Sequence, residues 1–83
     1  MKLADQIRQF ALETYVEPAR ARGDRVVKIR AGDVNDAMGL RSRQPAVAGA
    51  LGAEKFQEFA QIRLLSREGP HQGANLVFTF ELV

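Results

Sequence analysis

The segment that decides the fold is DVNDAMGLRSRQPAVAGALG, residues 33–52. Its first part carries apolar residues at helical spacing, so that one helix face would hold Val34, Ala37, Met38 and Leu40. Gly39 stands where a left-handed helix end is expected, and the RSRQ stretch that follows is a polar turn. Pro45 suits the first position of a new helix, with Gln44 before it. The segment therefore predicts two short helices joined by a polar turn.

The second helix would turn apolar side chains inward and small residues outward. Its inward face would hold Val47, Ala50 and Leu51. Its outward positions would be Ala46, Ala48, Gly49 and Ala53. Gly52 interrupts the pattern. The AEKFQEFA stretch then resumes helical spacing, with Phe56 and either Phe59 or Ala60 inward. Residues 45–60 could form one helix or two, and the pattern leaves both open.

A helix and a strand precede this segment. Apolar residues at three- and four-residue steps mark an amphipathic helix that contains Leu3, Ile7, Phe10, Ala11, Tyr15 and Val16. We expect this helix to end near Pro18 or shortly after, because ARARGD ends in a glycine stop signal. RVVKIR, residues 25–30, is rich in β-branched residues and predicts a short strand.

A hairpin follows the segment. IRLLS, residues 62–66, predicts a strand, and REGPHQGAN, residues 67–75, predicts a loop because it contains two glycines and a proline. LVFTFELV, residues 76–83, alternates as a half-buried strand does. One face would hold Leu76, Phe78, Phe80 and Leu82, and the other Val77, Thr79, Glu81 and Val83. The two strands would form an antiparallel hairpin.

The predicted order is helix, strand, helix, helix with a short extension, strand, long turn and strand. This order resembles the winged helix-turn-helix family, and the resemblance covers most of the chain. The turn motif of the family is matched by Val34, Ala37, Met38, Gly39 and Leu40, with Val47 and Leu51 as anchors in the second helix. The resemblance implies an α+β fold in one domain, residues 1–83, whose C-terminal hairpin is the wing.

Two features depart from the family pattern. Asn35 stands where the family usually has a small residue, four positions before the bend glycine. The interval from Gly39 to Val47 is also longer than the usual spacing, which implies a longer turn. A plain helical hairpin that packs the core is the alternative interpretation of the same pattern.

Composition and charge restrict the class of protein. The chain has 83 residues, no cysteine and a net charge of +2, so we expect a single cytoplasmic domain without disulfides or cysteine–zinc sites. No apolar run approaches the roughly 20 residues of a membrane span, and Asp5 and Gln6 argue against a signal peptide. Residues 25–45 hold five basic and two acidic side chains. Such a basic patch is typical of a nucleic-acid surface, and a solvated surface of mixed charge is the alternative.

In the winged-helix family the second helix of the turn motif normally enters the major groove of DNA. The small outward residues of this helix cannot make the bidentate hydrogen bonds that discriminate bases. Polar groups gather just before the helix instead, where they would reach phosphates: Arg41, Ser42, Arg43 and Gln44. Flanking phosphate contacts are expected from Lys28, Arg30 and, in the wing, Arg67 and His71. The sequence therefore predicts a small transcriptional or accessory factor that binds double-stranded DNA mainly through its backbone.

No arrangement of residues points to catalysis. His71 is the only histidine, and neither a nucleophile elbow nor an HExxH motif occurs, so we expect no enzymatic activity, no metal and no cofactor. The acidic pairs Asp33/Asp36 and Glu54/Glu58 have helical spacing and are expected on helix surfaces.

A second hypothesis uses the same fold for protein contact. Residues 46–53 or the exposed edge of the hairpin would then bind another protein or a second copy of the chain. The bare outward surface of that helix and the near-neutral total charge favour this hypothesis, whereas the element order and the position of the arginines favour DNA.

Overall fold

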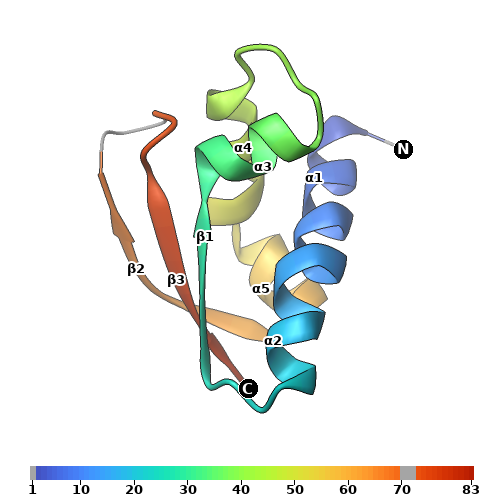
Figure 1. Cartoon of the computed structure of the whole chain (residues 1–83), viewed down its shortest axis with the longest axis vertical. Helices are drawn as coiled ribbons and strands as arrows, with labels where there is room; N and C mark the ends of the chain where they lie inside the picture. Colours follow the sequence, from blue (N-terminus) through green and yellow to red (C-terminus); the bar gives the residue numbers. More distant parts are fainter. Residues whose placement is uncertain (1, 70–72) are drawn as a thin grey trace.

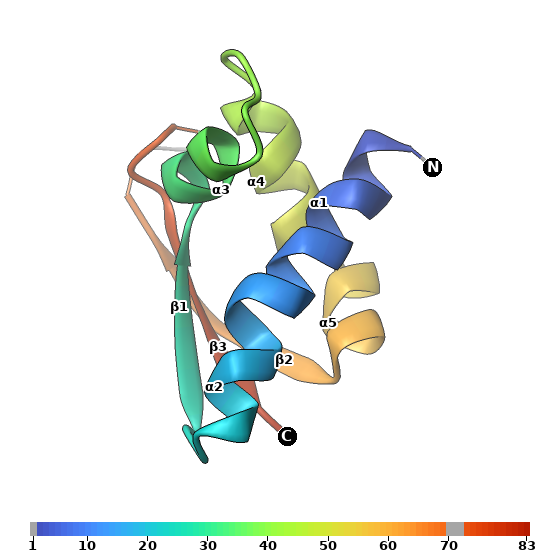
Figure 2. The ribbon, with the colours of Figure 1, turned by 45° about the vertical axis from the view of Figure 1, so that its right-hand side comes forward.

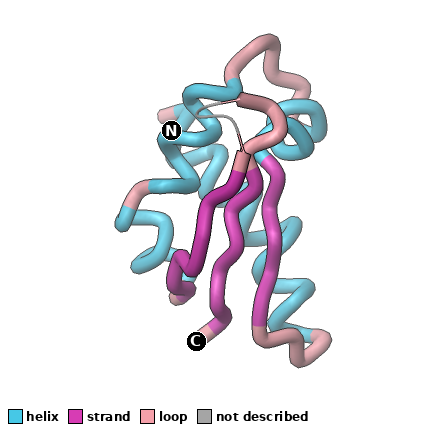
Figure 3. Tube along the Cα trace, turned by 90° about the vertical axis from the view of Figure 1, so that its left-hand side faces the viewer, coloured by secondary structure: helices cyan, strands magenta, loops and turns pink. Residues whose placement is uncertain are grey.

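The computed structural model describes residues 2–69 and 73–83. Its helices cover one face of a three-stranded antiparallel sheet (Figure 1). Figure 3 looks onto the sheet, with the helices behind it. The predicted α+β class and the predicted order of elements are both confirmed. Within these residues, no helix has the length and apolar character needed to cross a bilayer.

The N-terminal helix is continuous over three stretches, α1 (Leu3–Ala11), the π-helical turn η1 (Leu12–Val16) and α2 (Glu17–Ala21). At the end of η1 the N–H of Glu17 donates to the carbonyl of Leu12, five residues back, which makes a wider turn than an α-helix has. Pro18 comes next, has no N–H, and would crowd the carbonyl four residues back in a regular helix. We attribute the continuation past Pro18 to this wide turn. The helix ends at Ala21, as predicted, and Gly23 follows with a φ of 82°.

The strands are β1 (Val26–Arg30), β2 (Ile62–Glu68) and β3 (Val77–Leu82). β3 lies in the centre and is antiparallel to both neighbours. Val27 of β1 is the Cα partner of Phe80, and Ile29 is the partner of Phe78. All four side chains are buried against the helices, because alternate residues of a strand share one face. The predicted alternation of the last strand is therefore confirmed.

The hairpin differs from the prediction in one respect. β2 extends to Glu68, beyond the predicted strand of residues 62–66, so Arg67 belongs to a strand and not to the loop. The strand continues because its last residues still pair with β3, with Arg67 opposite Phe78. Gly69 then leaves the strand with a φ of 114°, a conformation that glycine adopts readily.

The decisive segment folds into α3 (Ala31–Ala37) and α4 (Gln44–Gly52), and α5 (Glu54–Ala60) follows. Pro45 is the second residue of α4 rather than the first. Ala53 has an extended backbone, with φ −79° and ψ 145°, so residues 45–60 form two helices. The prediction that Ala37 faces inward is wrong, because Ala37 is exposed and Asn35 takes a buried position on α3.

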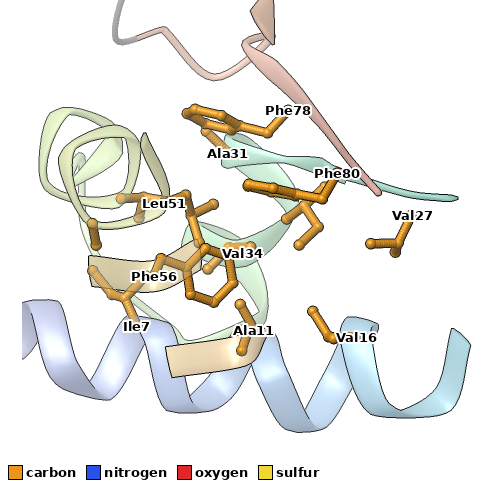
Figure 4. Close-up of a cluster of buried hydrophobic side chains, with 14 of the residues drawn as sticks. Ile7, Ala11, Val16, Val27, Ala31, Val34, Leu51, Phe56, Phe78 and Phe80 are labelled. Carbon is orange, nitrogen blue, oxygen red and sulfur yellow. The ribbon is translucent and has the colours of Figure 1, made fainter. Parts of the chain in front are cut away.

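The core lies between the sheet and the helices (Figure 4). Phe56 of α5 packs edge to face on Phe80, with 5.3 Å between ring centroids, and Phe78 stacks on Phe80 at 6.0 Å. The first helix closes the core with Ile7, Ala11 and Val16. Ala60 is buried whereas Phe59 is 47% exposed, so Ala60 is the inward member of that predicted pair.

Phe56→Ala is expected to lower the free energy of unfolding by about 3–5 kcal/mol, because it removes a ring that is fully buried. Phe59→Ala on the same helix is the matched control and should cost only about 1 kcal/mol or less, since its ring is half exposed. Urea denaturation followed by circular dichroism measures both changes. Equal losses for the two variants would contradict the assignment of Phe56 to the core.

Candidate nucleic-acid interface

The turn between α3 and α4 is held by the side chain of Asn35, which is 3% exposed. Its Nδ2 donates to the carbonyl of Leu40 at 3.0 Å, and its Oδ1 accepts the N–H of Arg43 at 3.0 Å. The backbone carbonyl of Asn35 also accepts the N–H of Leu40 at 3.0 Å. One buried amide therefore satisfies an acceptor at the start of the turn and a donor at its end.

This contact explains both departures from the turn motif. A small residue at position 35 would leave those backbone groups without partners, whereas an amide carries the donor and the acceptor that they need. The longer interval after Gly39 forms the loop that the amide spans. Gly39 has a φ of 70°, which confirms its predicted left-handed conformation, and Ser42 has a φ of 49°.

Arg41, Ser42 and Arg43 are exposed on this turn, which projects at one end of the molecule (Figures 1 and 2). Gln44 begins α4 and is partly buried. Within the described ranges, neither arginine side chain has an ion pair or a hydrogen bond to the protein. The structure thus brings the four predicted residues together at the start of α4, with both guanidinium groups free.

The exposed side of α4 is nearly bare. Its buried side holds Val47, Ala50 and Leu51, as predicted. The prediction that Ala48 faces outward is wrong, because α4 packs against both α1 and α3 and leaves Ala48 only 2% exposed. Pro45 and Gly49 remain exposed, and a Cβ at Gly49 would meet nothing within 4 Å. Neither residue has a side-chain group that could read the edge of a base.

Arg30 is used by the chain itself. Its guanidinium donates to Asp33 at 2.7 Å and to the side-chain oxygen of Asn75 at 2.7 Å. Beside it, the N–H of Gly32 donates to the carbonyl of Ala74 at 2.8 Å, and a Cβ at Gly32 would lie 2.8 Å from that same oxygen. Arg30 therefore fastens the start of α3 to the hairpin, and it is a weaker candidate for a phosphate contact than the sequence suggests.

Arg67 lies on the side of the sheet that faces the helices. It is the Cα partner of buried Phe78, and its guanidinium carbon is 5.2 Å from the centroid of that ring, which is within cation–π range. A Cβ at Gly52, the last residue of α4, would lie 3.2 Å from a guanidinium nitrogen of Arg67. The side chain is exposed and extends from β2 toward α4. Sequence patterns gave no signal for this contact, because it joins three separate elements.

The other two predicted flanking residues fall elsewhere. Lys28 is exposed in β1 between buried Val27 and Ile29, so it lies on the outer face of the sheet, opposite to Arg67. His71 lies outside the described residues. The residues predicted to flank the turn therefore do not share one surface, since Lys28 and Arg67 lie on opposite faces of the sheet.

Ion pairs and hydrogen bonds sort the basic side chains of residues 2–69 and 73–83 into two groups. Those held by a carboxylate or by another oxygen of the chain are Arg8, Arg20, Arg22, Arg30, Lys55 and Arg63. Those without such a partner are Lys2, Arg25, Lys28, Arg41, Arg43 and Arg67. Three of these six, Arg41, Arg43 and Arg67, lie at the two ends of α4.

Other features lie away from this surface. A cavity of about 240 Å³ between α1 and α5 is lined by Asp5, Arg8, Gln9, Lys55 and Phe59. Burial raises the pKa of the Tyr15 hydroxyl, and the negative charge of Asp33 raises it further, so Tyr15 stays protonated at neutral pH. Among the described residues, no three His, Cys, Asp or Glu side chains come together as a metal site would require.

Asn35→Ala is expected to lower the free energy of unfolding by about 1–3 kcal/mol, because it leaves the carbonyl of Leu40 and the N–H of Arg43 without their partner. Asn75→Ala is the matched control, since it removes an exposed amide and should cost about 1 kcal/mol or less. Urea unfolding measures the stabilities, and hydrogen exchange at the Arg43 amide reports on the turn. Unchanged exchange at Arg43 in Asn35→Ala would show that the amide does not hold the turn.

The chain matches no protein-family model, no curated protein and no solved structure.

Proposed function

We propose that this chain is a small non-enzymatic winged-helix domain that binds double-stranded DNA mainly through the phosphate backbone, as a transcriptional or accessory factor. The arrangement supports this proposal, because α3, a turn and α4 pack beside a sheet of order β1-β3-β2 whose last two strands form a hairpin. In the winged-helix family that hairpin is the wing, and α4 corresponds to the helix that faces DNA.

The observation that carries the proposal is the pair of unpaired arginines on a rigid turn at the start of α4. Arg41 and Arg43 have no carboxylate partner among the described residues, although the chain pairs most of its other arginines. The buried amide of Asn35 fixes the backbone that carries them. The N-terminus of α4 adds the partial positive charge of the helix dipole at the same place. Together the two guanidinium groups and the helix N-terminus favour the binding of a phosphate group at this turn.

The bare surface of α4 indicates the kind of contact. Pro45 and Gly49 let α4 approach another surface closely, but they offer no hydrogen bonds to bases. Binding through backbone phosphates requires no such bonds and discriminates little between sequences. We therefore expect weak dependence on base sequence and strong dependence on salt concentration.

The test is fluorescence anisotropy with a mixed-sequence DNA duplex over a range of salt concentrations. The wild type is expected to bind with a dissociation constant in the range of about 10⁻⁴–10⁻⁶ M at physiological salt, as non-specific binders do. Arg41→Ala/Arg43→Ala should weaken binding at least about tenfold and reduce the slope of log affinity against log salt by about 2, because two phosphate contacts are lost.

The chain offers a control with the same change of net charge. Arg22→Ala/Arg25→Ala alters the turn between α2 and β1, at the opposite end of the molecule from the α3–α4 turn (Figure 1). This variant should lose little affinity and retain the wild-type salt slope. Equal losses in both double variants would mean that net charge alone, and not the turn, accounts for binding. A wild type that fails to bind at low salt would refute the proposal.

A protein-binding module is the second candidate, and one observation favours it. Phe59 is 47% exposed beside the cavity between α1 and α5, which leaves an aromatic side chain accessible to a partner. The surfaces predicted from the sequence receive less support. α4 exposes little more than Pro45 and Gly49, and at the free edge of β2 the N–H of Leu64 is bonded to the side chain of Gln57 at 3.0 Å. Sedimentation of wild type and Phe59→Ser distinguishes self-association through this ring from a monomer.

A further inference from the structure

The position of Arg67 is determined by residues on two other elements. Its guanidinium lies over the ring of Phe78 in β3, 5.2 Å from the centroid, and beside Gly52 at the end of α4. Phe78 is fully buried, so the guanidinium forms part of the cover of its ring. A guanidinium held between an aromatic ring and a backbone in this way is restrained before any ligand arrives.

The guanidinium can lie beside the end of α4 because Gly52 has no side chain. A Cβ at this position would stand 3.2 Å from a nitrogen of Arg67, which is tighter than most Cβ contacts, and 3.4 Å from the ring of Phe78. A side chain at position 52 would therefore require the guanidinium to shift from its place beside the end of α4. The glycine that interrupts the apolar pattern of the sequence thus has a role in placing a charge.

The N–H groups of the Arg67 guanidinium have no acceptor among the described residues. Arg67 has no carboxylate partner and no side-chain hydrogen bond to the described residues. Its N–H donors can therefore bind a phosphate in bidentate fashion. Arg63 on the same strand differs, because its side chain faces the outer side of the sheet and pairs with Glu81.

Free cations therefore stand at both ends of α4, Arg41 and Arg43 before its first turn and Arg67 beside its last residue. The helix runs from Gln44 to Gly52, so its ends lie roughly 12 Å apart at a rise of about 1.5 Å per residue. The major groove of B-form DNA is also about 12 Å wide. A helix of this length can therefore lie in the groove with a cationic group near each of its ends, toward the two backbones that border the groove.

We propose that Arg67, positioned by Phe78 and Gly52, binds the phosphate backbone on the side of the major groove opposite to that bound by Arg41 and Arg43. This inference rests on the proposed function and adds the geometry of the complex. The surface of α4 that carries Pro45 and Gly49 then faces the groove, and the domain favours a duplex because a single strand lacks the second backbone.

The test compares a DNA duplex with a single strand of the same length and uses Arg67→Ala, with Arg63→Ala as the matched control on the same strand. Arg67→Ala is expected to weaken duplex binding about tenfold, the order expected for the loss of hydrogen bonds to a charged group. It should also lower the salt slope by about 1, and it should leave single-strand binding nearly unchanged. Arg63→Ala should change neither affinity.

Gly52→Ala tests the placement of the charge while every cation is retained. It should weaken duplex binding in the same direction as Arg67→Ala, and it should add no further loss in the double variant, because both changes remove one interaction. Thermal unfolding of each variant confirms that the domain is folded. Additive losses would overturn the positioning role of Gly52.

The outcomes separate the two proposals. If the wild type does not bind duplex DNA, the proposed function fails and this inference fails with it. If the wild type binds and Arg67→Ala resembles Arg63→Ala, the proposed function stands and the inference is overturned. If Arg67→Ala weakens duplex and single-strand binding equally, Arg67 contacts phosphate but the arrangement across two backbones is overturned.

Discussion

The hydrogen bonds of Asn35 are the constraint on which the proposed interface depends. Its amide joins the carbonyl of Leu40 to the N–H of Arg43 from a buried position in α3. Without this amide, the carbonyl of Leu40 and the N–H of Arg43 would have no hydrogen-bond partner within the protein. Because the amide of Asn35 binds both groups, the start of α4 is fixed and the backbone that carries Arg41 and Arg43 is held in place. The charge of the turn is thereby coupled to the packing of the core.

Pairing matters more than total charge for this surface. The net charge of +2 is small, and several arginines serve the fold itself: Arg8 and Arg20 bind backbone carbonyls of other elements, and Arg30 links α3 to the hairpin. Of the six basic side chains that remain without a partner among the described residues, three lie at the ends of α4. A weakly basic chain can thus hold a locally strong positive field, because its acidic side chains neutralise basic ones at other places.

Local patterns were sufficient to predict the elements of this fold. The alternation of the last strand and the left-handed glycine at position 39 depend on near neighbours in the chain, and the structure confirms them. The spacing around Val34 predicted a helix correctly but placed Ala37 on the wrong face. Contacts between distant residues could not be predicted in this way. The burial of Ala48 depends on α1, and the extension of β2 through Arg67 depends on pairing with β3. Asn35 did carry a signal, since it departed from the turn motif, but its meaning required the geometry of the longer turn.

The close approach of Gly32 to Ala74 has a consequence for the energetics of association. A backbone hydrogen bond of 2.8 Å, together with the two bonds of Arg30, joins the start of α3 to the loop end of the hairpin. Flexible basic arms lose conformational entropy when a ligand orders them. A surface that folding has already ordered avoids much of that loss, so in the proposed complex with DNA the free energy of association would come largely from released counterions.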